Sequence, residues 1–209
     1  MTAPWPATSR YGLTPAPGGL ALVQDLLNTA PAGTPPEPDL LADDASSRAW
    51  ARAATAAWAQ ATGQLVPQMV PDPDGLAELR AFRDELHRLT ATPPPEAGDP
   101  AAVPVLHTAT AALQLDENGQ VHLEPRGTGW RRIASLVLVA AFEGQRADTR
   151  RRLKVCRNPR CAVTFYDRSR NNSGVWHDVK ICGNAANLRA YRARQKQQSP
   201  KAAARFEGR

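Results

Sequence analysis

The three cysteines of the chain all lie within 27 residues near its C-terminal end, together with one histidine. Cys156 and Cys161 form one pair with four residues between them, and His177 and Cys182 form a second pair with the same spacing. Thiolate sulfur and imidazole nitrogen are the usual ligands of a closed tetrahedral zinc site. The spacing therefore predicts one structural Zn²⁺ ion bound by all four residues.

Two other interpretations of the cysteines fit the sequence less well. Buried core cysteines are common, but here Arg157, Arg160 and Lys180 stand inside the two pairs, which favours exposed turns over a core. A disulfide would leave one cysteine unpaired, and no export signal is present. A reducing cytoplasm is therefore the expected location.

Catalysis is not expected from these residues. Four protein ligands leave no open position on the metal for water or substrate. The chain also lacks a phosphate-binding loop, a dinucleotide glycine pattern, a nucleophile elbow and an HExxH motif. His87, His107 and His122 each stand alone and fit ordinary surface or core positions better than a general base. We expect a protein that is not an enzyme.

The residues around the ligands resemble a known family. The resemblance rests on Cys156-x4-Cys161, Phe165-Tyr166-Asp167, Ser169-Arg170-Asn171, Trp176-His177 and Cys182-Gly183-Asn184. This pattern is similar to the CGNR-type zinc finger. The segment 20–29 (LALVQDLLNT) looks like the start of the ABATE domain that precedes this finger in bacterial, stress-induced transcription regulators. The resemblance implies regulation of transcription, with the finger binding DNA and the N-terminal domain sensing a ligand or contacting a partner.

The chain departs from the family pattern at two positions. His177 stands where the family usually has a fourth cysteine, although three cysteines and one histidine are also an ordinary structural zinc set. Ala185 stands where the family name implies arginine, so the role of that arginine is either missing or is taken by Arg189 or Arg192.

Charge is distributed unevenly along the chain. From residue 145 onward there are 17 Lys and Arg against 4 Asp and Glu, although the whole chain has a formal net charge of only +6. A basic module on an acidic body indicates a polyanionic partner. We predict DNA, contacted by the cations of the finger loop and the last helix: Arg168, Arg170, Arg189, Arg192, Arg194 and Lys196. The alternatives are an adaptor that docks on an acidic protein and a redox sensor whose zinc thiolates are oxidised.

The predicted fold class is α+β. It consists of a mainly helical N-terminal domain with a small β-hairpin, followed by a treble-clef-like zinc finger. Composition shifts divide the chain into a flexible leader 1–18, an ABATE-like domain 19–147, the finger 148–198 and a basic tail 199–209.

Hydrophobic periodicity and turn residues place the individual elements. The short apolar run 19–28 fits a helix, with a buried strand as the alternative. The alanine-rich stretch 39–63 predicts two helices, the second capped within 43–46. The remaining expected elements are a helix at 76–89, a hairpin at 111–124 around Asn118-Gly119, a buried helix at 130–142, a finger hairpin at 153–166 and a last helix at 185–197 capped by Asn184.

A ligand pocket is expected between the helices 19–28, 76–89 and 130–142. Asn28, Arg80 and Arg83 are the polar residues there that could orient a small-molecule effector. The sequence also leaves a homodimer open as an assembly. No run approaches the roughly 18 apolar residues of a membrane span, so no membrane partner is expected.

Overall fold

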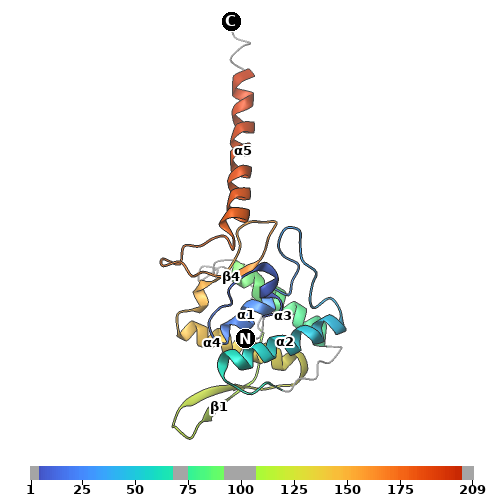
Figure 1. The fold of residues 1–209 in the computed structure, drawn as a ribbon, viewed down its shortest axis with the longest axis vertical. Coiled ribbons are helices and arrows are strands. Elements are labelled where there is room, and N and C mark those ends of the chain that lie inside the picture. Colours follow the sequence, from blue (N-terminus) through green and yellow to red (C-terminus); the bar gives the residue numbers. More distant parts are fainter. Residues whose placement is uncertain (1–4, 68–74, 92–106, 204–209) are drawn as a thin grey trace, which may run out of the picture.

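The computed structural model describes residues 5–67, 75–91 and 107–203, with side chains up to residue 195. The fold is mainly helical with two small antiparallel sheets, which confirms the predicted α+β class (Figure 1). Its elements are, in chain order, a 3₁₀ helix Thr8–Tyr11, α1 Leu20–Leu27, α2 Asp44–Thr62, α3 Gly75–Ala91, β1 Ala111–Leu115, β2 Val121–Pro125, α4 Gly129–Arg146, a 3₁₀ turn Arg150–Arg152, β3 Leu153–Val155, β4 Thr164–Tyr166, a π-helical turn Val179–Gly183 and α5 Asn184–Ala203.

Helix α1 lies at the centre of the body and is buried along its whole length. It contacts α2, α3, α4 and β4, and Leu22, Val23 and Leu26 are at most 1% exposed. A helix surrounded by other elements buries every face, which explains why its sequence is apolar nearly all round. The run 19–28 is therefore a helix, and the strand alternative is wrong.

The stretch 39–63 contains one helix instead of the two expected. Asp43 caps α2 as predicted: its carboxylate accepts a bond from the Ser46 amide at 2.8 Å, and the Ser46 hydroxyl lies 3.4 Å from the Asp43 amide. The residues before it form turns, because their main chain is bonded elsewhere. The Leu40 amide donates to Thr29 at 2.9 Å, and the Leu41 amide donates to the Asp39 side chain at 2.8 Å.

The segment 5–18 is packed onto the body, so the prediction of a flexible leader is wrong for these residues; residues 1–4 lie outside the described part. Trp5 and Ala7 belong to the core. The buried Asp25 carboxylate accepts bonds from the amides of Ala7 at 3.1 Å and Thr8 at 2.7 Å, and from the Trp50 indole at 2.9 Å. Burial raises the pKa of Asp25 above its usual value, although these hydrogen bonds partly offset the increase.

Strands β1 and β2 pair in the register Leu113 to Leu123 and form the expected hairpin. The turn is wider than an Asn-Gly pair, because the Asp116 carboxylate accepts bonds from the amides of Asn118 and Gln120 and so organises five residues. The hairpin extends from the body at the end opposite α5 (Figure 1).

Helix α5 stands away from the body, with its C-terminal end farthest out (Figure 1). It continues directly from the π-helical turn, which begins after Asp178, whose side chain accepts a bond from the Ile181 amide at 2.9 Å. Asp178 is therefore the cap, and the prediction that Asn184 caps this helix is wrong. The helix also passes through Pro200, beyond the expected end at 197. In the described part of the chain, no helix is both long enough and apolar enough to span a bilayer.

Candidate metal centre and nucleic-acid interface

The four predicted metal ligands converge in one cluster. The ligand atoms of Cys156, Cys161, His177 and Cys182 all lie within 4.8 Å of one another. His177 Nδ1 lies 3.3 Å from Cys161 Sγ and 3.6 Å from Cys182 Sγ. A tetrahedral zinc ion with ordinary bond lengths places nitrogen and sulfur ligands roughly 3.5 Å apart. The donor set and its spacing fit one structural zinc ion, with His177 binding through Nδ1.

The first ligand pair lies in a tight turn between β3 and β4. The Cys156 amide donates to Val163 at 2.9 Å, and the Cys161 amide donates to Asn158 at 2.8 Å. Ala162, which follows the second ligand, has a left-handed φ of 57°. Such a φ is uncommon for a residue with a side chain, and here it turns the chain back into β4 so that both sulfurs face the same point.

The second ligand pair comes from the start of the long helix. His177 precedes the π-helical turn, and Cys182 lies within it and is 1% exposed. Trp176 packs against the cluster that includes all three cysteines. One pair from a hairpin turn and one from a helix start form the treble-clef-like arrangement that was predicted.

The thiols differ in how readily they ionise. A hydrogen bond from Cys161 lowers the pKa of Cys156 to about 4, and the same bond raises the pKa of Cys161. Burial raises the pKa of Cys182. The cluster alone thus favours one thiolate that shares a proton with its neighbour. A zinc ion supplies the positive charge that stabilises all three thiolates, so binding must release protons.

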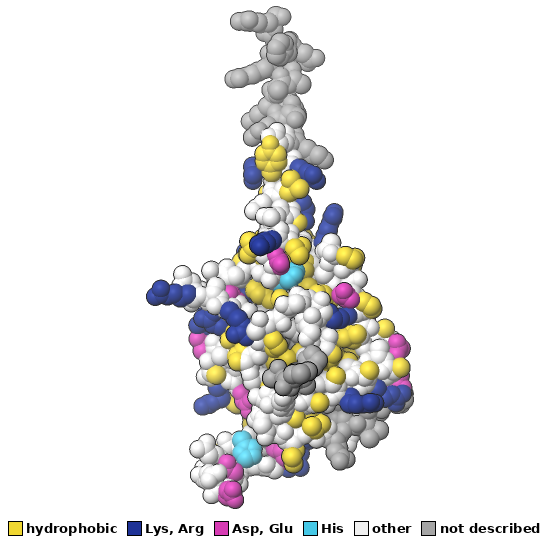
Figure 2. Space-filling view, viewed as in Figure 1, with side chains coloured by type: hydrophobic (Ala, Val, Ile, Leu, Met, Phe, Trp, Pro, Cys, Tyr) yellow, Lys and Arg dark blue, Asp and Glu magenta, His cyan; other side chains and the backbone are white. Residues whose placement is uncertain are grey.

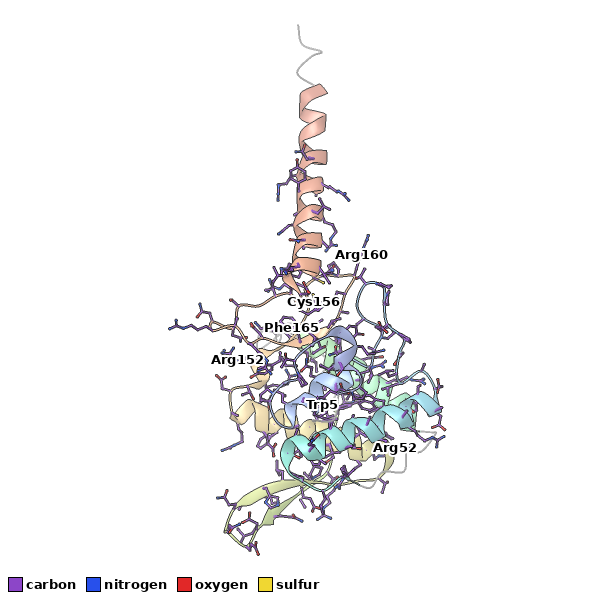
Figure 3. The ribbon with its side chains drawn as sticks, in the orientation of Figure 1. Trp5, Arg52, Arg152, Cys156, Arg160 and Phe165 are labelled. Carbon is purple, nitrogen blue, oxygen red and sulfur yellow. The ribbon has the colours of Figure 1, made fainter. Side chains whose placement is uncertain are left out.

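Asn158 connects the metal site to α5. It is 4% exposed and its Nδ2 donates to Cys182 Sγ at 3.2 Å. Its Oδ1 accepts a bond from Arg189 Nη2 at 2.9 Å. Figure 3 shows Cys156 beneath the first turns of α5. Partners of this kind orient metal ligands and tune their charge.

Asp167 organises the polar loop that follows β4. Its side chain accepts bonds from Lys154 Nζ at 2.7 Å and from the amides of Ser169 and Gly174 at 2.8 and 2.7 Å. Burial tends to raise the pKa of Asp167, but these donors outweigh it and hold the pKa well below its usual range. Gly174 is required here, since a Cβ at that position would lie 2.8 Å from the carboxylate.

The turn that carries the first ligand pair, residues 156–161, is called the first knuckle. The N-terminal body bonds to this knuckle and to the start of β4 through the main chain of residues 160–164. The Gly33 amide donates to Cys161 at 2.7 Å, and His87 Nε2 lies 2.9 Å from the Ala162 carbonyl. Asn28 bonds to both main-chain groups of Thr164. The finger is therefore docked on the N-terminal domain and not joined to it by a free linker.

The cations predicted to contact DNA fall into two groups. Arg168 and Arg189 make internal contacts: Arg168 donates to the Pro15 carbonyl at 2.6 Å and lies over the Tyr166 ring, whereas Arg189 bonds to Asn158. The exposed group consists of Arg170, Arg192 and Arg194, which have no hydrogen bond or ion pair with the described part of the chain. Lys196 lies on α5, but its side chain is outside the described residues.

The three residues predicted to bind an effector have internal partners. Arg80 donates to the carbonyls of Leu41 and Ala42 at 2.5 and 2.7 Å. Arg83 is 4% exposed and bonds to Asp39 at 2.6 Å. Asn28 is bonded to Thr164, so all three side chains are used to hold the fold together.

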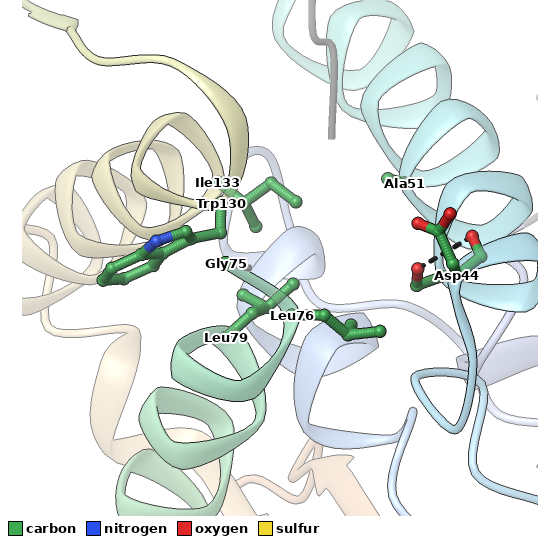
Figure 4. A pocket seen from close by; sticks show the side chains of 8 residues that line it. Asp44, Ala51, Gly75, Leu76, Leu79, Trp130 and Ile133 are labelled. Carbon is green, nitrogen blue, oxygen red and sulfur yellow. Dashed lines mark hydrogen bonds between the residues drawn. The ribbon is translucent and has the colours of Figure 1, made fainter. Parts of the chain in front are cut away.

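A small cavity lies against α2, α3 and α4 (Figure 4). Leu76, Leu79 and Trp130 form its apolar wall. Its space for water measures about 20 Å³, which is close to the volume one water molecule needs. This cavity is too small for a metabolite.

The sequence did not predict the residues that bond to the metal ligands or to the main chain beside them. Asn158 lies in an Asn-Pro step inside the first ligand pair, and this turn signal could have identified it as a structural residue. Gly33 and His87 gave no such signal, because their contacts depend on how distant helices pack against the finger.

Comparison with known families agrees with this arrangement. Residues 152–195 match the model of the CGNR zinc finger. Residues 20–144 match the ABATE model, which is described as "Putative stress-induced transcription regulator". A search of curated proteins found no match. The ABATE match spans more than half of the chain, and the finger match includes all four clustered ligands. The chain therefore belongs to the ABATE family and carries a C-terminal CGNR zinc finger.

Proposed function

We propose that the protein regulates transcription by binding duplex DNA through its finger, with α5 lying in a groove. The observation that carries this proposal is the shape and charge of α5. The helix has 20 residues, a length of about 30 Å. Its five charged residues, Arg189, Arg192, Arg194, Lys196 and Lys201, are all cations.

Helix α5 is rich in alanine, arginine and glutamine, which are strong helix formers. Its described side chains are largely exposed: Leu188 is 49% and Tyr191 53% exposed. Figure 2 shows Lys and Arg side chains along the projecting helix. The major groove of DNA accepts an α-helix, and phosphates on both sides of the groove would neutralise the exposed cations of α5, Arg192 and Arg194 among them.

The metal centre would fix the N-terminal end of this helix to the rest of the finger. Zinc would join the hairpin turn to the π-helical turn that leads into α5, so the bound metal would hold the helix at a fixed angle to the body. A reducing cytoplasm, where thiols remain free to bind metal, suits such a site. The N-terminal domain would hold the finger in place and present its remaining surface to a partner protein. The homodimer and the small-molecule effector gain no support from the contacts described above.

Fluorescence anisotropy with labelled duplex DNA at several salt concentrations tests the proposal. Wild-type protein should bind with a steep salt dependence. Replacing Arg192 or Arg194 with Gln should lower the log–log slope by about 0.9 each. Arg52→Gln is the matched control, because Arg52 is exposed on α2 and far from α5 (Figure 3). If wild-type protein binds duplex DNA no better than a zinc-free preparation does, the proposal is wrong and an adaptor role gains support.

A second candidate is a redox sensor, and a cavity beside the metal ligands favours it. The cavity has a volume of about 240 Å³ and is lined by Cys161, His177 and Cys182 together with Tyr11 and Glu37. Hydrogen peroxide could enter it. Two thiolates would give up two electrons and form a disulfide. Peroxide would take these electrons and two protons and give two waters. The disulfide no longer binds the metal, so zinc would be released. Zinc release at micromolar peroxide would support this role, and retention of zinc after stoichiometric oxidant would exclude it.

A further inference from the structure

A chain of two side chains connects the zinc site with α5. Arg189 Nη2 donates to Asn158 Oδ1 at 2.9 Å, and Asn158 Nδ2 donates to Cys182 Sγ at 3.2 Å. Arg189 lies on α5, Asn158 lies in the first knuckle and Cys182 is the last metal ligand. The contact therefore spans both halves of the finger.

The orientation of the Asn158 amide is set by its donors. Its Oδ1 accepts a bond from the Arg160 amide at 3.3 Å as well as the bond from Arg189. With the oxygen held by two N–H groups, the amide nitrogen must face the sulfur. The opposite orientation would place an oxygen against a thiolate, with repulsion in place of a hydrogen bond.

Few other contacts fix the direction of α5. Within the described residues, its main contact with another element is with the π-helical turn that precedes it. A helix attached only at its first turn can pivot there. Arg189 lies about one turn into α5, so its bond to the knuckle gives the helix a second point of attachment.

We propose that Arg189 is a positioning residue that holds Asn158 against the zinc-bound Cys182 thiolate and fixes the direction of α5. It therefore does not contact phosphate. The part of this proposal that concerns DNA depends on the function proposed above, whereas the part that concerns zinc does not.

The rate of zinc transfer to a chromogenic chelator tests the zinc part directly. Partners of metal ligands typically contribute 10–100-fold to metal affinity. Zinc should leave Arg189→Gln several-fold faster than wild type, and Arg189→Lys, which keeps a donor, should restore part of the difference. Arg192→Gln is the matched control on the same helix and should release zinc at the wild-type rate. Equal rates for Arg189→Gln and Arg192→Gln would overturn the proposal.

Asn158→Ala removes the other half of the contact. It should release zinc about 10-fold faster than wild type, and adding Arg189→Gln to it should bring little further change, since both act through one contact. Independent, multiplying effects would overturn the proposal. Because Asn158 is buried, the Asn158→Ala variant must first show the helicity and zinc content of wild type. If it does not, the zinc release rate of Arg189→Gln alone decides the role of Arg189.

Salt-dependent DNA binding separates a positioning residue from a phosphate contact. Arg189→Gln should weaken binding while leaving the log–log salt slope unchanged, whereas Arg192→Gln should lower the slope by about 0.9. A lowered slope with an unchanged zinc release rate would make Arg189 a phosphate contact and overturn the proposal. If wild-type protein binds no DNA, the proposed function fails, and the zinc release rates still decide the role of Arg189.

Discussion

The side-chain amide of Asn28 bonds to both main-chain polar groups of Thr164. Its Oδ1 accepts from the Thr164 amide at 2.9 Å, and its Nδ2 donates to the Thr164 carbonyl at 2.9 Å. Both residues are 0% exposed. Asn28 ends α1 in the N-terminal domain, and Thr164 begins β4 of the finger, so one buried side chain joins the two family-defined segments.

Replacing Asn28 with Leu should destabilise the whole protein. The change keeps a similar volume but leaves the buried N–H of Thr164 without a partner, and it leaves the Thr164 C=O with only the longer bond from Gln24 Nε2 at 3.4 Å. An unpaired buried group costs about 1–3 kcal/mol, so the free energy of unfolding should fall by at least about 1–3 kcal/mol. Urea denaturation followed by circular dichroism measures this. Asn171→Leu, at an exposed position, is the control, and an equal loss in both variants would contradict the role assigned to Asn28.

Zinc removal should release α5 while β3 and β4 stay in place. The body holds the β3–β4 hairpin through Asn28, His87 and Gly33, whereas α5 depends on the metal and on Asn158. Hydrogen exchange measured by mass spectrometry should show fast exchange along α5 in Cys182→Ser and a still protected Thr164 amide.

Ser173→Ala, an exposed change in the polar loop that follows β4, should keep one zinc per chain and wild-type exchange. A finger that folds independently of the body would lose protection in β4 and α5 together after Cys182→Ser. That result would show that the docking contacts are weaker than their geometry indicates.

Asp167 should stabilise the protein at neutral pH and lose this effect in acid. Its folded-state pKa lies below the unfolded value of about 3.9. A depressed carboxyl pKa contributes stability that is present above the unfolded pKa and is lost as pH falls through the range below about 4. The stability difference between wild type and Asp167→Asn should therefore be largest near pH 7 and shrink below pH 4. Both proteins lose zinc in acid, so their difference isolates Asp167, and a constant difference across this range would contradict the assignment.

The sequence predicts the metal ligands well because zinc chemistry leaves few alternatives. Cysteine and histidine in two closely spaced pairs define both the ion and the turn that holds it. The apolar periodicity of α3 and α4 likewise predicts helices, because it reflects local geometry. The shorter apolar run of α1 also allowed a buried strand.

What the sequence could not predict depends on long-range packing. Trp5 looked like part of a loose leader. The segment is held by core packing and by distant partners such as the buried Asp25 carboxylate and the Gln24 side chain. Arg83 and Asn28 looked like polar groups of a pocket because both lie among apolar residues. Their partners, Asp39 and Thr164, are brought to them by the fold, and no spacing in the sequence signals this.

Arg83 should contribute to stability and not to effector binding. Its guanidinium is 4% exposed and bonds to Asp39 at 2.6 Å and to Asp84 at 2.8 Å. Burial works to lower the pKa of Arg83, but the two carboxylates outweigh it and raise the pKa. Breaking a buried pair costs about 3–5 kcal/mol. Asp39 keeps some contact with water, so Arg83→Met should cost roughly 3 kcal/mol.

A double variant distinguishes stability from effector binding. Arg83→Met with Asp39→Asn removes both charges but keeps an acceptor for the Leu41 amide. It should recover much of the lost stability, because no buried charge is left without its partner. Thermal melting of both variants, alone and with anionic metabolites, measures the two roles together. A metabolite that stabilises wild type but neither variant would show that the Arg83 cation binds an effector after all, since binding to the native state alone raises the melting temperature.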